Sequence, residues 1–289
     1  MTFSEWYLFR VLSVCALVAI VVAPPLSSSA QVSALVTLVF ILGVPHGAFD
    51  PFIAKQRRVW STFAGLIAFS LIYFLAALFV AIFWYFAPVI CLVLFLIISA
   101  WHFGADWTLH PLARLFMGIF VIGLPSVFHG KDVAEVFSVL SGDQTSWIVQ
   151  LLSFASLMSA GLILSLLLIK GRPVLSDKAF DVALLVASSA VFSPIVFFIL
   201  YFCALHSPMH IRQTLSSLQE RERRQALKFA LVFSILTIIL AAAAFIGVRL
   251  SSSADEAALR IVFVGLAALT VPHLILIDGY HLPQTGGRN

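Results

Sequence analysis

The chain consists of long, unbroken apolar runs that are separated by short polar segments. A transmembrane helix needs about 20 mostly apolar residues, because the hydrocarbon core of a bilayer is about 30 Å thick. Runs that approach or reach this length lie at residues 7–24, 32–53, 60–85, 88–106, 111–128, 147–169, 179–193, 195–217, 227–248 and 259–279. Unbroken runs indicate helices, since the strands of a membrane β-barrel alternate apolar and polar residues. The pattern predicts an all-α, polytopic transmembrane helix bundle of about ten spans (eight to ten) that forms a single integral membrane domain over residues 1–289.

The pattern is less regular in two segments. The seventh run is short, and Pro194 separates it from the eighth. The polar stretch between His129 and Ser146 is predicted to hold a short interfacial helix.

The N-terminal segment has a second interpretation. Arg10, the apolar run from Val11 to Val22 and the small residues Ser28 to Ala30 loosely resemble a secretory signal peptide. The segment before the run, however, carries Glu5 and only one basic residue. A retained first helix is therefore the preferred prediction.

Composition supports a membrane protein. The chain is 62% hydrophobic and only 10% charged, with a mean hydropathy of +1.08, whereas soluble domains average about 25% charged residues. This excludes a soluble globular enzyme, a disordered protein and a nucleic-acid binder. Cys15, Cys91 and Cys203 all lie in apolar runs, so they are predicted to be small buried hydrophobic residues and not disulfide partners.

If ten spans alternate from a cytoplasmic N-terminus, most Lys and Arg residues fall on the cytoplasmic side of the membrane. Of the 17 Lys and Arg residues, 14 then lie in cytoplasmic segments: Arg10, Lys55, Arg57, Arg58, Arg114, Lys170, Arg172, Lys178, Arg212, Arg221, Arg223, Arg224, Lys228 and Arg288. Cytoplasmic loops carry an excess of Lys and Arg, so both termini are predicted to be cytoplasmic, in a multi-pass protein of the cell inner (plasma) membrane. Merging the seventh and eighth runs would place one basic cluster outside, which favours keeping both.

Five of the eight histidines fall within predicted spans, namely His46, His102, His206, His210 and His273. Ionisable groups at membrane depth are costly and usually serve a function. In the ten-span arrangement the helices that carry them all run toward the cytoplasm, and their depths differ by about two turns. We expect them to be able to meet at one site, although a histidine that merely satisfies its hydrogen bonds in the core is the structural alternative. His110, His129 and His281 fall in polar segments and are predicted to be solvated.

The spacing of His206 and His210 points to a metal ion. The two are four residues apart, so they share one helix face. Together with His46 and His102 they would supply four neutral imidazoles, a set that suits iron, zinc or copper. Four histidines would close a tetrahedral zinc site, whereas octahedral iron would keep two open positions for oxygen chemistry. The set therefore favours iron.

Two strings repeat the pattern His-x-x-x-Asp, from His46 to Asp50 and from His102 to Asp106. A metal-bound histidine usually donates its other ring N–H to a carboxylate or carbonyl. Asp50 and Asp106 are candidates for this role, and the open alternative is that each lies in the wet interface beyond its span. Ordinary packing accounts for most of the 27 phenylalanines. Four that lie within a turn or two of the histidines are predicted to line a tunnel for a long apolar substrate: Phe49, Phe103, Phe198 and Phe202.

These motifs resemble the Brp/Blh family of membrane-integral β-carotene 15,15′-dioxygenases of bacteria and archaea, which are often associated with microbial rhodopsins. The matching strings are Gly43-Val44-Pro45-His46-Gly47-Ala48-Phe49-Asp50, His102-Phe103-Gly104-x-Asp106, His206-x-x-x-His210 and Pro272-His273. The resemblance extends from about residue 40 to residue 280, and the Pro-His-Gly-Ala-x-Asp string is its most specific part.

The resemblance implies cleavage of β-carotene by O₂ at its central double bond, which gives two all-trans retinal molecules. It implies a non-haem Fe(II) held by His46, His102, His206 and His210, with His273 near the substrate or behind a ligand. It also implies β-carotene, O₂ and membrane lipid as partners, and a functional link to a microbial rhodopsin.

Three other functions stay open on the residues alone. A di-iron carotenoid hydroxylase or lipid desaturase usually needs about eight histidine or carboxylate ligands, more than the five histidines in spans. A b-type haem electron carrier with two haems would need histidine pairs in both halves of the membrane. A transporter with a histidine proton relay would hold no tightly bound metal.

Overall fold

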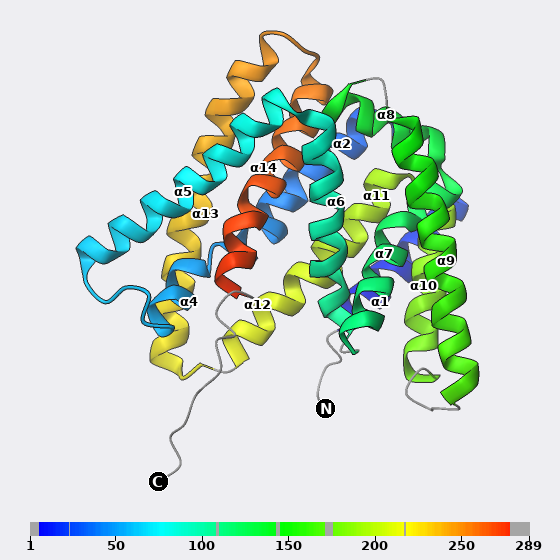
Figure 1. Cartoon of the computed structure of the whole chain (residues 1–289), viewed down its shortest axis with the longest axis horizontal. Coiled ribbons are helices and arrows are strands. Elements are labelled where there is room, and N and C mark those ends of the chain that lie inside the picture. Colours follow the sequence, from blue (N-terminus) through cyan, green and yellow to red (C-terminus); the bar gives the residue numbers. More distant parts are fainter. Residues whose placement is uncertain are drawn as a thin grey trace.

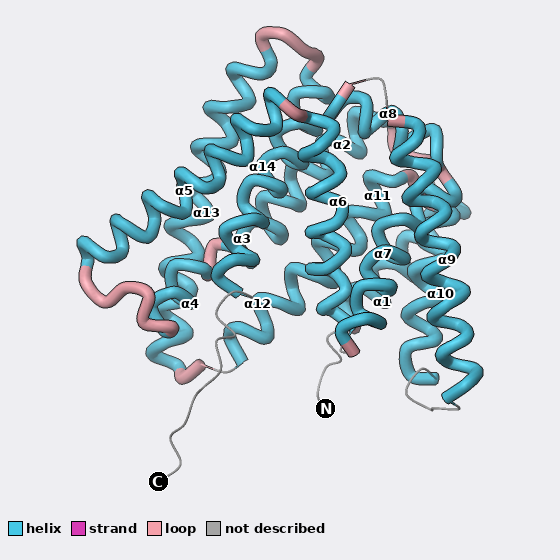
Figure 2. The backbone as a smooth tube through the Cα atoms, in the orientation of Figure 1, coloured by secondary structure: helices cyan, strands magenta, loops and turns pink. Residues whose placement is uncertain are grey.

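The computed structural model describes residues 6–22, 24–107, 110–142, 145–170, 176–216 and 218–277, and the regular elements in this part of the chain are all helical (Figure 2). In chain order they are α1 (Tyr7–Val22), α2 (Ser28–Leu38), η1 (Val39–Gly43), α3 (Val44–Gly47), α4 (Asp50–Gln56), α5 (Phe63–Phe86), α6 (Pro88–Gly104), η2 (Ala105–Trp107), α7 (Pro111–Phe128), α8 (Gly130–Ser141), α9 (Ser146–Lys170), α10 (Ser176–Val191), α11 (Pro194–Phe198), η4 (Ile199–His206), α12 (Ser207–Ser216), α13 (Glu220–Arg249) and α14 (Ala254–Ile277).

Eight helical segments of the described chain are long and apolar enough to cross a membrane. Two shorter apolar helices, Tyr7–Val21 and Ala179–Val191, match the first and seventh predicted spans. The predicted all-α bundle of eight to ten spans is confirmed. That it forms one domain over residues 1–289, with both termini cytoplasmic, stays a prediction. Arg172, His281 and Arg288, as well as the last two residues of the tenth predicted span, lie outside the described residues.

Caps and prolines set the beginnings of several helices. The side chains of Ser27 and Thr62 accept hydrogen bonds from the first turns of α2 and α5, and such caps satisfy backbone N–H groups that have no partner in the helix. Proline stands at the start of α6, α7 and α11, where its missing N–H costs nothing. Between α10 and α11, Ser193 caps the helix that Pro194 begins, so the seventh and eighth spans are separate helices, as predicted.

The polar stretch after α7 holds α8, which confirms the helix predicted there. Its buried residues Val133, Phe137 and Leu140 recur at helical spacing and pack against α6 and α9. Its position relative to a membrane surface stays a prediction.

Glycines allow α6 and α7 to approach closely. A Cβ atom added at Gly118 on α7 would collide with the backbone carbonyl of Ala100 on α6, and one added at Gly104 would collide with the carbonyl of Arg114. Small residues at such contacts are a general feature of membrane helix pairs. The close contact fixes the helix that carries His102.

Two π-helical turns, η1 and η4, were not predicted from the sequence. In both, the residue just before a proline donates its backbone N–H to the carbonyl five residues earlier: Val44 to Val39, before Pro45, and Ser207 to Phe202, before Pro208. A proline ring in a regular α-helix clashes with the carbonyl four residues before it, and a wider turn relieves this crowding. The Ser207 hydroxyl also donates to the Leu42 carbonyl, which ties η4 to η1.

The helical segments that carry the five histidines run in the same direction. In Figure 1 the chain descends from α2 to α4, along α6, from α11 to α12 and along α14. This common direction is what the ten-span alternation predicts for these segments.

Candidate metal centre

Five histidines converge inside the bundle. His46 lies on α3, His102 on α6 and His273 on α14. His206, at the end of η4, and His210, on α12, belong to one continuous helical segment, so four segments supply the five histidines. The ring centroid of His206 is 4.6 Å from that of His210 and 4.7 Å from that of His102. The His46 centroid is 5.4 Å from that of His206 and 5.5 Å from that of His273. The structure thus brings together every histidine that falls within a predicted span.

The ring nitrogens form two groups of three. In each group one ligand atom per residue lies within 4.8 Å of the others: His46, His102 and His273 in one, and His102, His206 and His210 in the other. His102 belongs to both groups and so links them. The four histidines expected as ligands are therefore not a set of their own, because His273 is grouped with His46 and His102.

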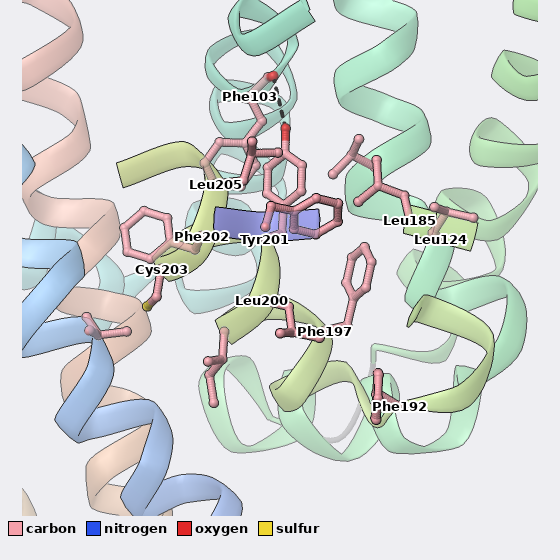
Figure 3. Packing of buried hydrophobic residues seen from close by; sticks show 14 of the residues in the cluster. Phe103, Leu124, Leu185, Phe192, Phe197, Leu200, Tyr201, Phe202, Cys203 and Leu205 are labelled. Atoms are coloured by element: carbon pink, nitrogen blue, oxygen red, sulfur yellow. Dashed lines mark hydrogen bonds between the residues drawn. The ribbon is translucent and has the colours of Figure 1, made fainter. Parts of the chain in front are cut away.

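Asp106 holds the imidazole of His206. The Nδ1 atom of His206 lies 3.0 Å from one carboxylate oxygen of Asp106 and 3.1 Å from the other. The Tyr201 hydroxyl donates to the same carboxylate at 2.9 Å. Figure 3 shows the Tyr201 ring among buried apolar side chains, with its hydroxyl directed at the Phe103 carbonyl, 3.3 Å away. Asp106 also lies 3.7 Å from Nε2 of His210.

Asp50 holds His273 in the same way. The Nδ1 atom of His273 is 2.9 Å from both carboxylate oxygens of Asp50. The Tyr73 hydroxyl, from the middle of α5, donates to Asp50 at 2.7 Å. The two arrangements are therefore parallel, since each joins a tyrosine, an aspartate and a histidine. In the first, Tyr201 and His206 both belong to η4 and Asp106 to η2, whereas in the second the three residues come from α5, α4 and α14.

Both aspartates are buried, with exposed fractions of 1% for Asp50 and 3% for Asp106. The alternative that they lie in the wet interface is therefore wrong. Each binds a histidine of another helix and not the histidine of its own His-x-x-x-Asp string. His46 instead uses the Gly43 carbonyl, 2.5 Å from its Nδ1.

A large apolar cavity reaches the cluster on the side of His46, His102 and His273. The empty space in it, counted together with the part that is open to the outside, is about 1170 Å³. At its other end it is lined by Phe74 on α5 and by Leu236 and Leu240 on α13, side chains that are 43–48% exposed. The cavity therefore opens between α5 and α13, on a face that would meet lipid in a membrane.

Three of the four phenylalanines predicted for a tunnel line this cavity, namely Phe103, Phe198 and Phe202. Phe49 does not line it; it is buried with Ala48, Phe52, Leu218, Ala226 and Ala230. Among the other histidines, His110 is exposed, and His129 lies 3.8 Å from Asp132 between α7 and α8.

Two comparisons assign the chain to a family. A model of the β-carotene 15,15′-dioxygenase family matches residues 37–281, a range that includes all five histidines and both aspartates. A protein named β-carotene 15,15′-dioxygenase, from the uncultured marine bacterium 66A03, is 32% identical over 267 residues, which cover 86% of this chain and 93% of that protein. The chain belongs to the β-carotene 15,15′-dioxygenase family. No solved structure matches it. The family indicated by the sequence motifs is thus confirmed.

In this member of the β-carotene 15,15′-dioxygenase family, the site residues fit a divalent metal ion. The Nε2 atom of His206 is fully buried and has no hydrogen-bond partner among the described residues, while Asp106 occupies Nδ1. A buried polar atom without a partner is costly, and a metal ion would use it. The carboxylates of Asp50 and Asp106 also bring two negative charges into an apolar interior, where a divalent cation would balance them.

The sequence motifs did not identify the two tyrosines of the site. Tyr73 and Tyr201 are two of only five tyrosines in the chain, and both lie in the middle of apolar runs. A phenol inside a membrane span needs a hydrogen-bond partner. That position is the signal that would have linked these residues to the two aspartates.

Proposed function

We propose that this chain is a non-haem Fe(II)-dependent dioxygenase that cleaves β-carotene at its central double bond into two molecules of all-trans retinal. The observation that carries the proposal is the junction of a carboxylate-anchored histidine cluster with an apolar cavity that opens on a lipid-facing side. β-Carotene dissolves in lipid, so it would reach the histidines through the opening between α5 and α13 without crossing water.

The reaction balances without a further reductant. One C=C bond is broken and two C=O bonds form, so that each atom of O₂ ends in one of the two aldehydes. Iron, when bound, would supply the activation of O₂. No protein acid or base is required, which suits a cavity in which the carboxylates of Asp50 and Asp106 are already engaged by His and Tyr.

The protein's part is to hold the ion and to exclude water. We assign His46, His102, His206 and His210 as ligands, and we add His273 as a fifth imidazole, since Asp50 anchors it as Asp106 anchors His206. Carboxylates behind metal-bound histidines fix the ring orientation and raise the basicity of the ligand. Phe103, Phe198 and Phe202 would line the path of the polyene.

Co-expression in cells that make β-carotene tests this function. We expect the orange colour to be lost and retinal to appear by chromatography, whereas His206→Ala expressed at the same level leaves the carotenoid intact. Purified protein should hold about one Fe per chain, and a chelator should abolish turnover until Fe(II) is restored. Retained β-carotene with iron-loaded protein would refute the proposal.

The same purified protein separates the rival functions. A b-type haem carrier would show a Soret band, a di-iron hydroxylase would hold two Fe per chain, and a proton-relay transporter would hold no tightly bound metal. We place the protein in the inner (plasma) membrane, where retinal released into the bilayer would be available to a microbial rhodopsin.

A further inference from the structure

A second apolar cavity lies beside the first, and residues of α6 and α11 line both. The empty space in it, counted together with the part that is open to the outside, is about 820 Å³, and it is lined by residues of α6, α7, α8, α11, η4 and α14. Among the described residues that line it, only Ser99 and Tyr201 have polar side-chain groups, and the Tyr201 hydroxyl is bound to Asp106. The described residues that line it are buried or partly buried, whereas Phe74, Leu236 and Leu240 of the first cavity are exposed.

The two cavities meet next to the histidine cluster. Phe95, Ser99, Phe103 and Phe198 line both of them. Ser99 lies one turn before His102 on α6, and the Phe103 ring centroid is 4.7 Å from that of His206. The boundary between the two cavities is therefore formed by three aromatic rings and the small side chain of Ser99.

Cleavage at the midpoint of a rigid polyene sets a geometric requirement. Equal lengths of the molecule must extend on both sides of the reacting bond. The first cavity opens toward lipid, so it has no end wall that would stop the molecule at a given depth. The second cavity has such a wall, formed by Val133, Val136, Phe137 and Leu140 of α8, a helix that does not line the first cavity.

We propose that the second cavity receives the leading half of the carotenoid, and that its α8 wall fixes which double bond stops at the histidines. This inference rests on the proposed function and deepens it. The site binds an apolar, conjugated half-molecule with a terminal ring, for which its six phenylalanines, Phe95, Phe103, Phe137, Phe197, Phe198 and Phe263, provide aromatic walls. Depth in this cavity, and not recognition of a polar group, would then give the central cut.

The variant Val136→Phe shortens the second cavity at its α8 wall. We expect the turnover of β-carotene to fall by roughly tenfold or more, the scale on which an apolar pocket rejects a group that it cannot hold. A β-apocarotenal that keeps one intact ring half, but lacks the end of the other, should still be cleaved to retinal within about threefold of the wild-type rate, since its truncated half fits the shortened cavity. Leu151→Phe on α9 adds a similar ring at a side chain that is 58% exposed, and it should leave both rates unchanged.

A binding measurement makes the test independent of turnover. Protein stripped of iron with a chelator should retain β-carotene after purification from carotenoid-producing cells, and Val136→Phe should retain much less. Iron binding shows whether each variant is folded. If Val136→Phe fails to hold iron, Ser99→Leu replaces it, because it adds bulk at the boundary between the two cavities.

The outcomes separate this inference from the proposed function. If iron-loaded wild-type protein does not cleave β-carotene, the proposed function fails. If the wild type is active and Val136→Phe cleaves β-carotene at the same rate, the second cavity does not hold the substrate. Equal loss of both substrates in an iron-loaded variant would also overturn the inference, because length would then not matter.

Discussion

The buried aspartates show how single residues prepare this site. Asp50 and Asp106 each accept a hydrogen bond from a tyrosine and bind Nδ1 of a histidine. These contacts fix the ring orientation of His206 and His273 before any ion binds. Residues that act behind a ligand in this way commonly change metal affinity by about 10–100-fold.

Asp106→Asn and Asp50→Asn test this role. Each variant keeps the shape of the side chain but removes its negative charge, so we expect iron affinity to fall by about 10–100-fold in both. Chelator competition on purified protein measures the change. Asp132→Asn, at a side chain that is 54% exposed, is the control and should bind iron as the wild type does.

Different results for the two aspartates would also be informative. If Asp50→Asn binds iron normally but loses turnover, then His273 contacts substrate or oxygen and is not a fifth ligand. If both variants bind iron normally, the orienting role of the carboxylates is wrong.

The sequence indicated which histidines cluster more clearly than it indicated their partners. Intramembrane position singles out the five histidines, because a polar ring is rare and costly in an apolar run. The partner of His273 is 223 positions away in the chain, however, and no local spacing encodes such a pair. Phe49 shows the converse limit: it is three residues from His46, yet its side chain packs away from the cavity.

At the scale of elements, π-helical turns place two of the histidine-bearing segments. η1 ends three residues before His46, and His206 is the last residue of η4. Such wide turns are frequent at functional sites. They could not be predicted from apolar periodicity, since one extra residue in a turn hardly changes a run that is apolar on all faces; the prolines at 45 and 208 were the only local signal.

The contact between α6 and α7 sets the position of His102, and Gly118→Ala tests it. The added methyl group would meet the Ala100 carbonyl, so we expect a loss of about 1–3 kcal/mol in stability from overpacking and lower iron binding as α6 is displaced. Thermal unfolding in detergent and iron content are the measurements. Gly265→Ala is the matched control, because a Cβ there meets nothing within 4 Å. Equal melting temperatures for the two variants would contradict this role of the contact.

For the whole molecule, apolar run length and the Lys and Arg distribution were sufficient to predict the order of helices and the common direction of the histidine-bearing segments. They could not predict the two cavities, because a cavity depends on which side chains meet between helices that are distant in sequence. Phe95 on α6 and Phe198 on α11, for example, border both cavities, yet nothing in either run distinguishes them from other phenylalanines.

The orientation in the membrane is the part of the topology that rests on charge alone, and cysteine labelling tests it. Asp132→Cys lies at the start of α8, between two spans, and Glu220→Cys lies at the start of α13, next to Arg221, Arg223 and Arg224. Both native side chains are well exposed, at 54% and 66%. The positive-inside rule places the basic segment in the cytoplasm. We therefore expect an impermeant maleimide to label Asp132→Cys in intact cells, and to label Glu220→Cys only after the cells are opened. The reverse pattern would invert the orientation of the bundle and would place the histidine cluster in the outer half of the bilayer.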